Sequence, residues 1–330
     1  MTPATENKGI FVISLDFELM WGIWDVTDIK KYGNHIRGVE KVIPRLLSLF
    51  KEYDIKATFA TVGFLFARNK EELLAANPAL LPSYSNDSYN VYKKEVACIG
   101  DNEQNDPYHF GYSLLEMIKN SEHEIGTHTY SHYYCLEEGQ TAEEFDADLK
   151  AAITIARRDN TGLKSLVFPR NQINPEYLDI LLSNGISVYR GNPSSWIYKP
   201  RRFSAEVPFI RFCRLLDTYL PISGSNTYLV KKEDSGLVNI PASRFLKPYD
   251  TRFSWLEKLR MNRIRNEMTK AAQKNQMYHL WWHPHNFGMN LEENICFLTE
   301  LLKHYRYLNQ QYGFSSKTML QAAETTEMNS

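Results

Sequence analysis

The chain is 330 residues long and 43% hydrophobic, which is enough apolar material for a sizeable core. Its 38 Lys and Arg residues nearly balance 39 Asp and Glu residues, so the overall charge gives no support to nucleic-acid binding. The 4 cysteines lie far apart, residues 1–8 are polar and unlike a signal peptide, and no apolar run reaches membrane-spanning length. We therefore expect a cytoplasmic protein without a transmembrane segment.

The first predicted strand, residues 10–15, is a nearly continuous apolar run of the kind buried on both faces of a sheet. It leads into Asp16 and Glu18, which are followed by an apolar stretch. Carboxylates in apolar surroundings usually have a functional partner, so both are candidate site residues. A helix is predicted over residues 38–53, with Pro44 either in its first turn or at a kink.

A second strand is predicted over residues 56–62, and residues 83–111 form a polar stretch without periodicity, which we interpret as an insertion. A third strand, residues 122–127, leads into His128 and His132. Two imidazoles at this spacing can bind one divalent ion, although nine histidines will also produce the pattern by chance.

The second half of the chain continues the alternation of helices and strands. The further helices are predicted over residues 141–159, 175–184 and 291–310, and the further strands over residues 165–168, 186–189, 237–240 and 278–282. A second insertion is expected near residues 192–236. Residues 244–274 carry nine Lys or Arg against three acids. This basic segment is interpreted as a solvated helix or as a contact for a phosphate or a membrane surface.

Seven strands separated by helices or insertions, with no internal repeat or linker, predict one α/β domain over residues 1–330: a distorted (β/α) barrel of about seven parallel strands. The candidate polar residues follow strand ends, which lie on one face of such a barrel. Besides the residues already named, they are Arg170, Arg190, His283 and His285.

These strand-end motifs resemble the polysaccharide deacetylase family, the carbohydrate esterases that share the NodB homology domain. The stretch His128-Thr129-Tyr130-Ser131-His132 fits the family's His-Ser/Thr-x-x-His motif. The resemblance implies that Glu18, His128 and His132 hold a divalent metal ion, with zinc as the first choice. It further implies that Asp16 is the catalytic base, that Arg170 keeps Asp16 ionised, and that His283 is the general acid.

Two assignments within this resemblance stay open. The family usually has Asp where this chain has Glu18, so the roles of Asp16 and Glu18 could be exchanged. His283 and His285 could likewise exchange roles. Tyr130, Arg190, Trp282 and His285 are the expected substrate contacts. The aromatic residues near the expected rim, which also include Trp21, Trp24 and Trp281, could stack on a sugar ring or serve only in packing.

The resemblance implies removal of an acyl group, N-acetyl as first choice, from a sugar or sugar conjugate, with surface polysaccharide biosynthesis as the expected setting. Two alternatives remain: a metal-dependent amidohydrolase of a small non-sugar amide, and a non-catalytic carbohydrate-binding relative. The sequence leaves the oligomeric state undetermined.

Overall fold

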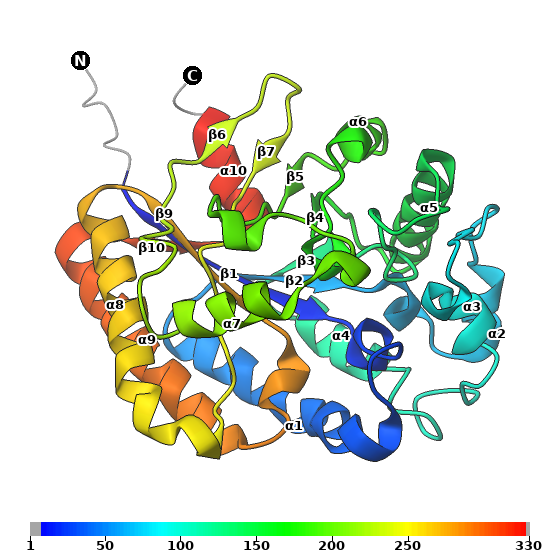
Figure 1. The fold of residues 1–330 in the computed structure, drawn as a ribbon, viewed down its shortest axis with the longest axis horizontal. Coiled ribbons are helices and arrows are strands. Elements are labelled where there is room, and N and C mark those ends of the chain that lie inside the picture. Colours follow the sequence, from blue (N-terminus) through cyan, green and yellow to red (C-terminus); the bar gives the residue numbers. More distant parts are fainter. Residues whose placement is uncertain (1–7, 328–330) are drawn as a thin grey trace.

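The computed structural model describes residues 8–327 (Figure 1). A ten-stranded sheet runs through its centre in the order β6-β7-β5-β4-β3-β2-β1-β9-β8, with β10 also paired to β1. The strands are β1 Ile10–Phe17, β2 Ala57–Thr61, β3 Glu124–Thr127, β4 Ser165–Leu166, β5 Val188–Tyr189, β6 Lys231–Lys232, β7 Val238–Asn239, β8 Arg244–Phe245, β9 Met277–Trp282 and β10 Ser315–Lys317. All pairings are parallel except that of β6 with β7.

The sheet curls into an incomplete barrel with β6 and β8 at its two edges, so the predicted distorted parallel barrel is confirmed. Each of the seven predicted strands is present. No pattern in the sequence indicates β6, β8 or β10, because β6 and β8 are only two residues long and β10 is polar and half-buried. Strands this short carry too few residues to show an alternating pattern.

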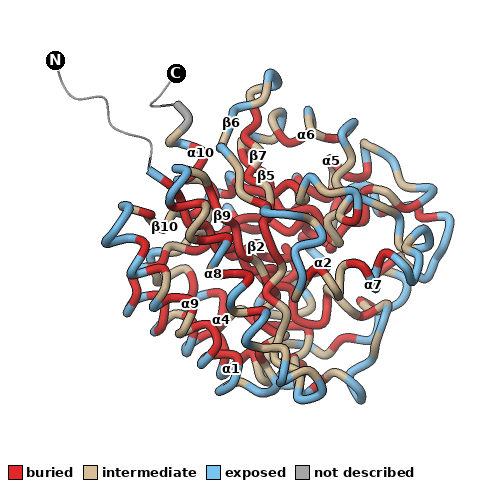
Figure 2. Tube along the Cα trace, turned by 60° about the vertical axis from the view of Figure 1, so that its left-hand side comes forward, coloured by how far each residue is buried: buried red, intermediate tan, exposed pale blue. Residues whose placement is uncertain are grey.

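Helices flank the sheet on both sides. They are α1 Ile29–Glu52, α2 Lys70–Ala75, α3 Val91–Lys94, α4 Tyr112–Lys119, α5 Ala142–Arg158, α6 Leu178–Ser183, α7 Pro208–Asp217, α8 Glu257–Gln273, α9 Leu291–Tyr312 and α10 Met319–Glu327. Figure 2 shows that buried positions follow the strands and the inward faces of the helices. None of the helices within residues 8–327 is both long and apolar enough to cross a bilayer.

Helix α1 differs from its prediction. It begins at Ile29, where Asp28 caps the first turn through its side chain, and it runs through Pro44. Pro44 therefore lies inside the helix and does not mark its first turn. The apolar stripe that includes Ile36, Val39 and Val42 is buried against the core, and this packing outweighs the hydrogen bond that Pro44 cannot donate.

The basic segment 244–274 contains β8 and α8, and its arginines are used inside the fold. Arg244 donates to Glu267 at 2.8 and 2.9 Å, and Arg263 donates to Asp217 at 2.9 Å. Arg260, also buried, pairs with a glutamate one turn earlier. Buried charges require such partners. Helix α8 packs on the sheet and keeps one exposed face, as the interpretation of a solvated helix over the sheet expected. Its buried arginines are nevertheless paired and are not free for a phosphate or a membrane.

Candidate functional site

The carboxyl ends of the central strands bring the candidate residues together. Asp16 lies within β1 and Glu18 follows it directly, while His128, Arg190 and His283 follow β3, β5 and β9. Because β1 pairs with β2 and β9 in parallel, these ends point to the same edge of the sheet. This convergence was the expectation drawn from the sequence.

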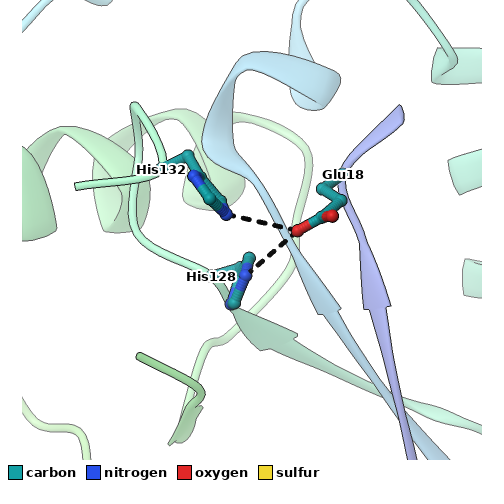
Figure 3. Close-up of side chains that lie close together, drawn as sticks. All are labelled: Glu18, His128 and His132. Atoms are coloured by element: carbon teal, nitrogen blue, oxygen red, sulfur yellow. Dashed lines mark ion pairs between the residues drawn. The ribbon is translucent and has the colours of Figure 1, made fainter. Parts of the chain in front are cut away.

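Glu18, His128 and His132 form a compact group (Figure 3). The Oε2 atom of Glu18 lies 3.3 Å from Nε2 of His128 and 3.2 Å from Nε2 of His132. All three side chains are buried. Two imidazole nitrogens and one carboxylate oxygen directed at a common point form a donor set typical of zinc and similar metals.

The orientation of His128 fits a metal ligand. Its Nδ1 lies 2.8 Å from the carbonyl oxygen of Val167, so the Nδ1 proton is donated there and the Nε2 lone pair faces Glu18. Burial lowers the pKa of His132, although Glu18 opposes this, and its buried Nδ1 has no hydrogen-bond partner among the described residues. Two imidazole nitrogens face one carboxylate oxygen, and a cation bound between them would satisfy all three groups.

A second group of potential ligands also uses Glu18 and consists of Glu18, His283 and His285. Nε2 of His283 lies 3.5 Å from Oε1 of Glu18, and its Nδ1 lies 3.1 Å from Oδ1 of Asn286. The ring of His285 stacks on that of His283, with centroids 5.0 Å apart. Burial lowers the pKa of His285 to about 3, so it is a neutral side chain beneath His283.

Asp16 has a different set of neighbours. Arg190 donates to both of its oxygens, from Nη1 at 2.6 Å and from Nη2 at 2.8 Å. Burial raises the pKa of Asp16, but Arg190, together with His128 and His283, outweighs burial, and the net pKa is lowered. Burial likewise raises the pKa of Glu18, and the three surrounding histidines lower it well below its usual range. Both carboxylates are therefore held ionised.

The expected contact between Arg170 and Asp16 is not formed. Arg170 donates from Nη2 to Asp25 at 2.5 Å and stacks over the ring of Tyr134. The guanidinium beside Asp16 belongs to Arg190, which we had expected to contact substrate. Arg190 is fully buried, so its position corresponds to support of the carboxylate. Both arginines follow short strands, and the sequence could not tell which one reached β1.

Two aromatic residues expected to contact substrate lie in the core instead. Tyr130 is fully buried, and its hydroxyl donates to the carbonyl of Leu73 at 2.6 Å. Trp282 is fully buried against Phe287. The neighbouring Trp281 is half-buried and lies on the site side of the strand.

Trp281 contacts the groups that surround the carboxylates. Its ring lies 4.2 Å from the Arg190 guanidinium carbon and 5.5 Å from the ring of His283. Neighbouring residues of a strand face opposite ways, so only one of two adjacent tryptophans can line the site.

A buried carboxylate that was not among the predicted site residues holds the histidine motif in place. Asp148 of α5 accepts hydrogen bonds from the backbone N–H groups of Tyr130 and Ser131, at 2.7 and 3.2 Å. Burial raises its pKa to about 6. Its signal in the sequence was an acid at helical spacing within an apolar stripe, beside Leu149 and Ala152.

A second overlooked residue supports Arg190 from behind. His279 lies inside β9, and its Nε2 is 2.8 Å from Oγ of Ser14, which also accepts from Arg190 at 3.0 Å. Burial lowers the pKa of His279 to about 3. A histidine inside an apolar strand was the available signal. The contacts that run from His279 through Ser14 and Arg190 to Asp16 fix the carboxylate by residues of β9 and β1 and by the residue that follows β5.

Strained backbone gathers at this edge of the sheet. Five non-glycine residues beside or within the motifs have positive φ angles: Leu19 (49°), Thr129 (61°), His132 (58°), Arg170 (54°) and Asn171 (53°). Such conformations cost free energy and persist where the surrounding structure enforces them, often at functional sites. The positions of the histidine pair and of Arg170 are therefore set by more than local preference.

Comparisons with known proteins agree with this picture. The family model described as polysaccharide deacetylase matches residues 32–189, which include His128, His132 and Arg170. Asp16, Glu18, Arg190 and His283 lie outside that match. A search of curated protein sequences gives no match.

Solved structures share the fold at low sequence identity. A protein of Mycobacterium smegmatis assigned as a polysaccharide deacetylase has a TM-score of 0.60 and 14% identity, over 99% of this chain and 93% of its own. A protein of Pseudomonas aeruginosa PAO1 with the same assignment has a TM-score of 0.53 and 10% identity, over 96% of this chain and 89% of its own. An allantoinase has a TM-score of 0.56 and 10% identity, over 97% and 91%. Residues 32–189 thus match the polysaccharide deacetylase family, and the solved structures show that the chain shares the fold of proteins assigned to it.

Proposed function

We propose that this protein is a metal-dependent hydrolase that removes an acyl group, N-acetyl as first choice, from a sugar or sugar conjugate. The observation that carries the proposal is the convergence of Glu18, His128 and His132 beside an ionised Asp16 and a partly exposed His283. The match to the polysaccharide deacetylase family supports the substrate class. A role in surface polysaccharide biosynthesis extends the same proposal.

Glu18, His128 and His132 would hold the divalent metal ion, with zinc as the first choice because two of the three ligands are imidazoles. A cation bound there would supply Lewis acidity toward water and toward the acyl oxygen. The group that contains His285 is the weaker alternative, because it would use His283 as a ligand and remove it from proton transfer. His285 then serves as a buried, neutral support for the His283 ring.

Asp16 is well placed to accept the proton of the attacking water. Arg190 keeps its carboxylate ionised near neutral pH, which is the state a general base requires. Glu18 faces the two imidazoles, and this difference in neighbours supports Asp16 as base and Glu18 as ligand over the reverse assignment. The longer Glu side chain reaches the histidine pair from a position beyond the end of β1.

His283 is proposed as the general acid that protonates the leaving amine. Its Nδ1 proton is directed at Asn286, so Nε2 is the atom that faces the site, 3.7 Å from Asp16 and 3.5 Å from Glu18. The side chain is 23% exposed, the largest exposure among these groups, as contact with a substrate requires.

A small non-sugar amide is the second candidate substrate, since an allantoinase shares the fold. A non-catalytic relative is the third, and retention of both carboxylates, the histidine pair and His283 counts against it. The location is proposed to be the cytoplasm, in keeping with four cysteines that are all free thiols.

Acetate release from N-acetylated sugars, measured beside metal content, tests the proposal. We expect stoichiometric metal and turnover that is lost in His283→Ala with the metal retained. A parallel panel of ureides and formamides separates the second candidate. Metal binding without turnover on either panel would favour the non-catalytic relative.

A further inference from the structure

A cavity of about 260 Å³ lies beside the proposed catalytic groups. Its wall includes Trp281 and Phe245, whose rings lie 5.5 and 5.9 Å from the ring of His283. Asn171 also lines it and accepts a hydrogen bond from Arg190 at 3.2 Å. The cavity is thus continuous with the site and is close in size to the roughly 300–1,000 Å³ of small-molecule pockets.

Positive charge dominates the lining of this cavity. Five cations line it, Arg170, Lys199, Arg201, Arg214 and Arg244, against one carboxylate, Glu206. Arg170 and Arg244 pair with acids behind the wall, and Arg214 pairs with Glu206. Within residues 8–327, no carboxylate oxygen lies close enough to the charged nitrogens of Lys199 or Arg201 to form an ion pair.

The hydrogen bonds of Arg201 leave its charge uncompensated. It donates to the backbone carbonyls of Ile197 and Trp196, at 3.3 and 2.8 Å, which fix the guanidinium at the cavity wall without neutralising it. The charge of Arg201 acts on the neighbouring Arg214. Burial lowers the pKa of Arg214, Glu206 opposes this effect, and Arg201 lowers the pKa further. Fixed like charges at close range cost free energy, and a bound anion would offset that cost.

Arg170 also lines this cavity, and one of its donors has no partner among the described residues. Its Nη1 is buried and has no hydrogen-bond partner within the described part of the chain, while Nη2 is held by Asp25. The backbone of Arg170 and of Asn171 is held at positive φ, 54° and 53°. A buried donor left unpaired is costly and calls for an acceptor.

We propose that this cavity binds an oxyanion, phosphate or carboxylate, carried by the substrate, so that the preferred substrate is an anionic acylated sugar. The proposal rests on the proposed function for the reaction and adds the substrate's charge and its binding site. Lys199 and Arg201 supply the uncompensated charge, Arg170 supplies a donor, and Trp281 places the sugar between the cavity and His283.

Turnover of matched substrates tests this inference. Acetate release is compared for N-acetylglucosamine, N-acetylglucosamine 1-phosphate and 6-phosphate, and an N-acetylated hexosaminuronic acid. Lys199 is exposed and forms no ion pair with the residues that the structure describes, so Lys199→Glu should fold normally. We expect wild type to prefer an anionic substrate, and Lys199→Glu to lower that preference, as a ratio of kcat/KM values, about tenfold.

Two control variants test whether the preference for an anionic substrate arises from this cavity. Lys199→Arg should retain the preference, and Lys41→Gln, an exposed cation on α1, should leave the ratio unchanged. Preference for the phosphates or for the uronic acid identifies which oxyanion the cavity takes. A preference that Lys199→Glu leaves intact would overturn the assignment to this cavity.

A binding measurement separates this inference from the proposed function. Calorimetry measures the binding of inorganic phosphate to the full chain as purified and again after metal has been removed by chelation. Phosphate binding that survives chelation and weakens in Lys199→Glu supports the anion site even if no substrate turns over. Turnover of neutral sugars without an anionic preference, and without phosphate binding, would overturn the anion site and leave the deacetylase proposal standing.

Discussion

The guanidinium of Arg190 lies against the carboxylate of Asp16 with two parallel hydrogen bonds of 2.6 and 2.8 Å. Both side chains are buried, and Ser14 and Trp281 hold the guanidinium in its plane. A paired geometry of this kind gives both strength and orientation. It determines the charge and the direction of the proposed base, although Arg190 follows β5 and Asp16 lies on β1.

Arg190→Gln should move the acidic limb of the pH–rate profile to higher pH. Arg190 lowers the pKa of Asp16 against the opposing effect of burial, so its removal raises that pKa and leaves the base protonated at lower pH. The loss of kcat should therefore be greater at pH 6 than at pH 8. The pH dependence of acetate release measures the limb.

Stability should respond to the same substitution. Because the folded-state pKa of Asp16 is lowered, the pair stabilises the fold above the unfolded pKa and this contribution is lost as pH falls through the folded pKa. Breaking a buried pair costs about 3–5 kcal/mol of unfolding free energy.

Arg190→Lys is the control for the pH–rate profile. It keeps the charge without the paired geometry, so it should shift the acidic limb of the profile less than Arg190→Gln does. An unchanged limb in both variants would exclude Asp16 as the titrating base.

Metal content should distinguish the two ligand groups that use Glu18. We expect His128→Ala and His132→Ala each to lose stoichiometric metal, because each leaves two protein ligands where the proposed site has three. His285→Ala should retain the metal. Elemental analysis after dialysis gives the answer, and the opposite pattern would move the metal to Glu18, His283 and His285.

The hydrogen bonds of Asp148 should contribute to stability. Its carboxylate accepts from two backbone N–H groups and from the Ser131 hydroxyl, and a carboxamide has one acceptor oxygen for these donors. We expect Asp148→Asn to cost about 1–3 kcal/mol of unfolding free energy. Urea unfolding measures this, with Asp146→Asn on the more exposed side of α5 as control.

The pH dependence of that cost follows from the raised pKa of about 6. The folded state holds the Asp148 proton more tightly than the unfolded chain, whose carboxyl titrates near 3.8. The contribution of Asp148 to stability therefore falls as pH rises from about 4 to 6. The difference between wild type and Asp148→Asn should narrow over this range, and a difference that widens would contradict the raised pKa.

The sequence predicted the barrel because apolar runs and helical stripes are long-range regularities that survive in one chain. The same regularity placed Asp16, Glu18, His128 and His283 at strand ends. Parallel pairing then brings such ends together whatever the lengths of the segments between them. The placement of these residues depends on the order of strands and helices, and the periodicity of apolar residues in the sequence reveals that order.

The predictions that the structure corrects concern the direction of side chains at the ends of short strands. Arg190 follows β5 directly and Arg170 lies beyond β4. Both strands are two residues long, which is too short for a pattern that shows which arginine reaches Asp16. The positive φ of Arg170 turns it toward Asp25. The partners within the basic segment depend on contacts between α7, β8 and α8, and such tertiary pairing leaves no pattern in a single sequence.

Opposite effects of Tyr130→Phe and Trp281→Phe should separate core packing from substrate contact. The Tyr130 hydroxyl bonds to the Leu73 carbonyl in the core, so its loss should cost about 1 kcal/mol of stability and leave KM unchanged. Trp281 lines the cavity between Arg190 and His283, so Trp281→Phe should raise KM with a small effect on stability. Steady-state kinetics and urea unfolding of both variants provide the comparison. A rise in KM confined to Tyr130→Phe would show that the wrong aromatic residue has been assigned to the substrate.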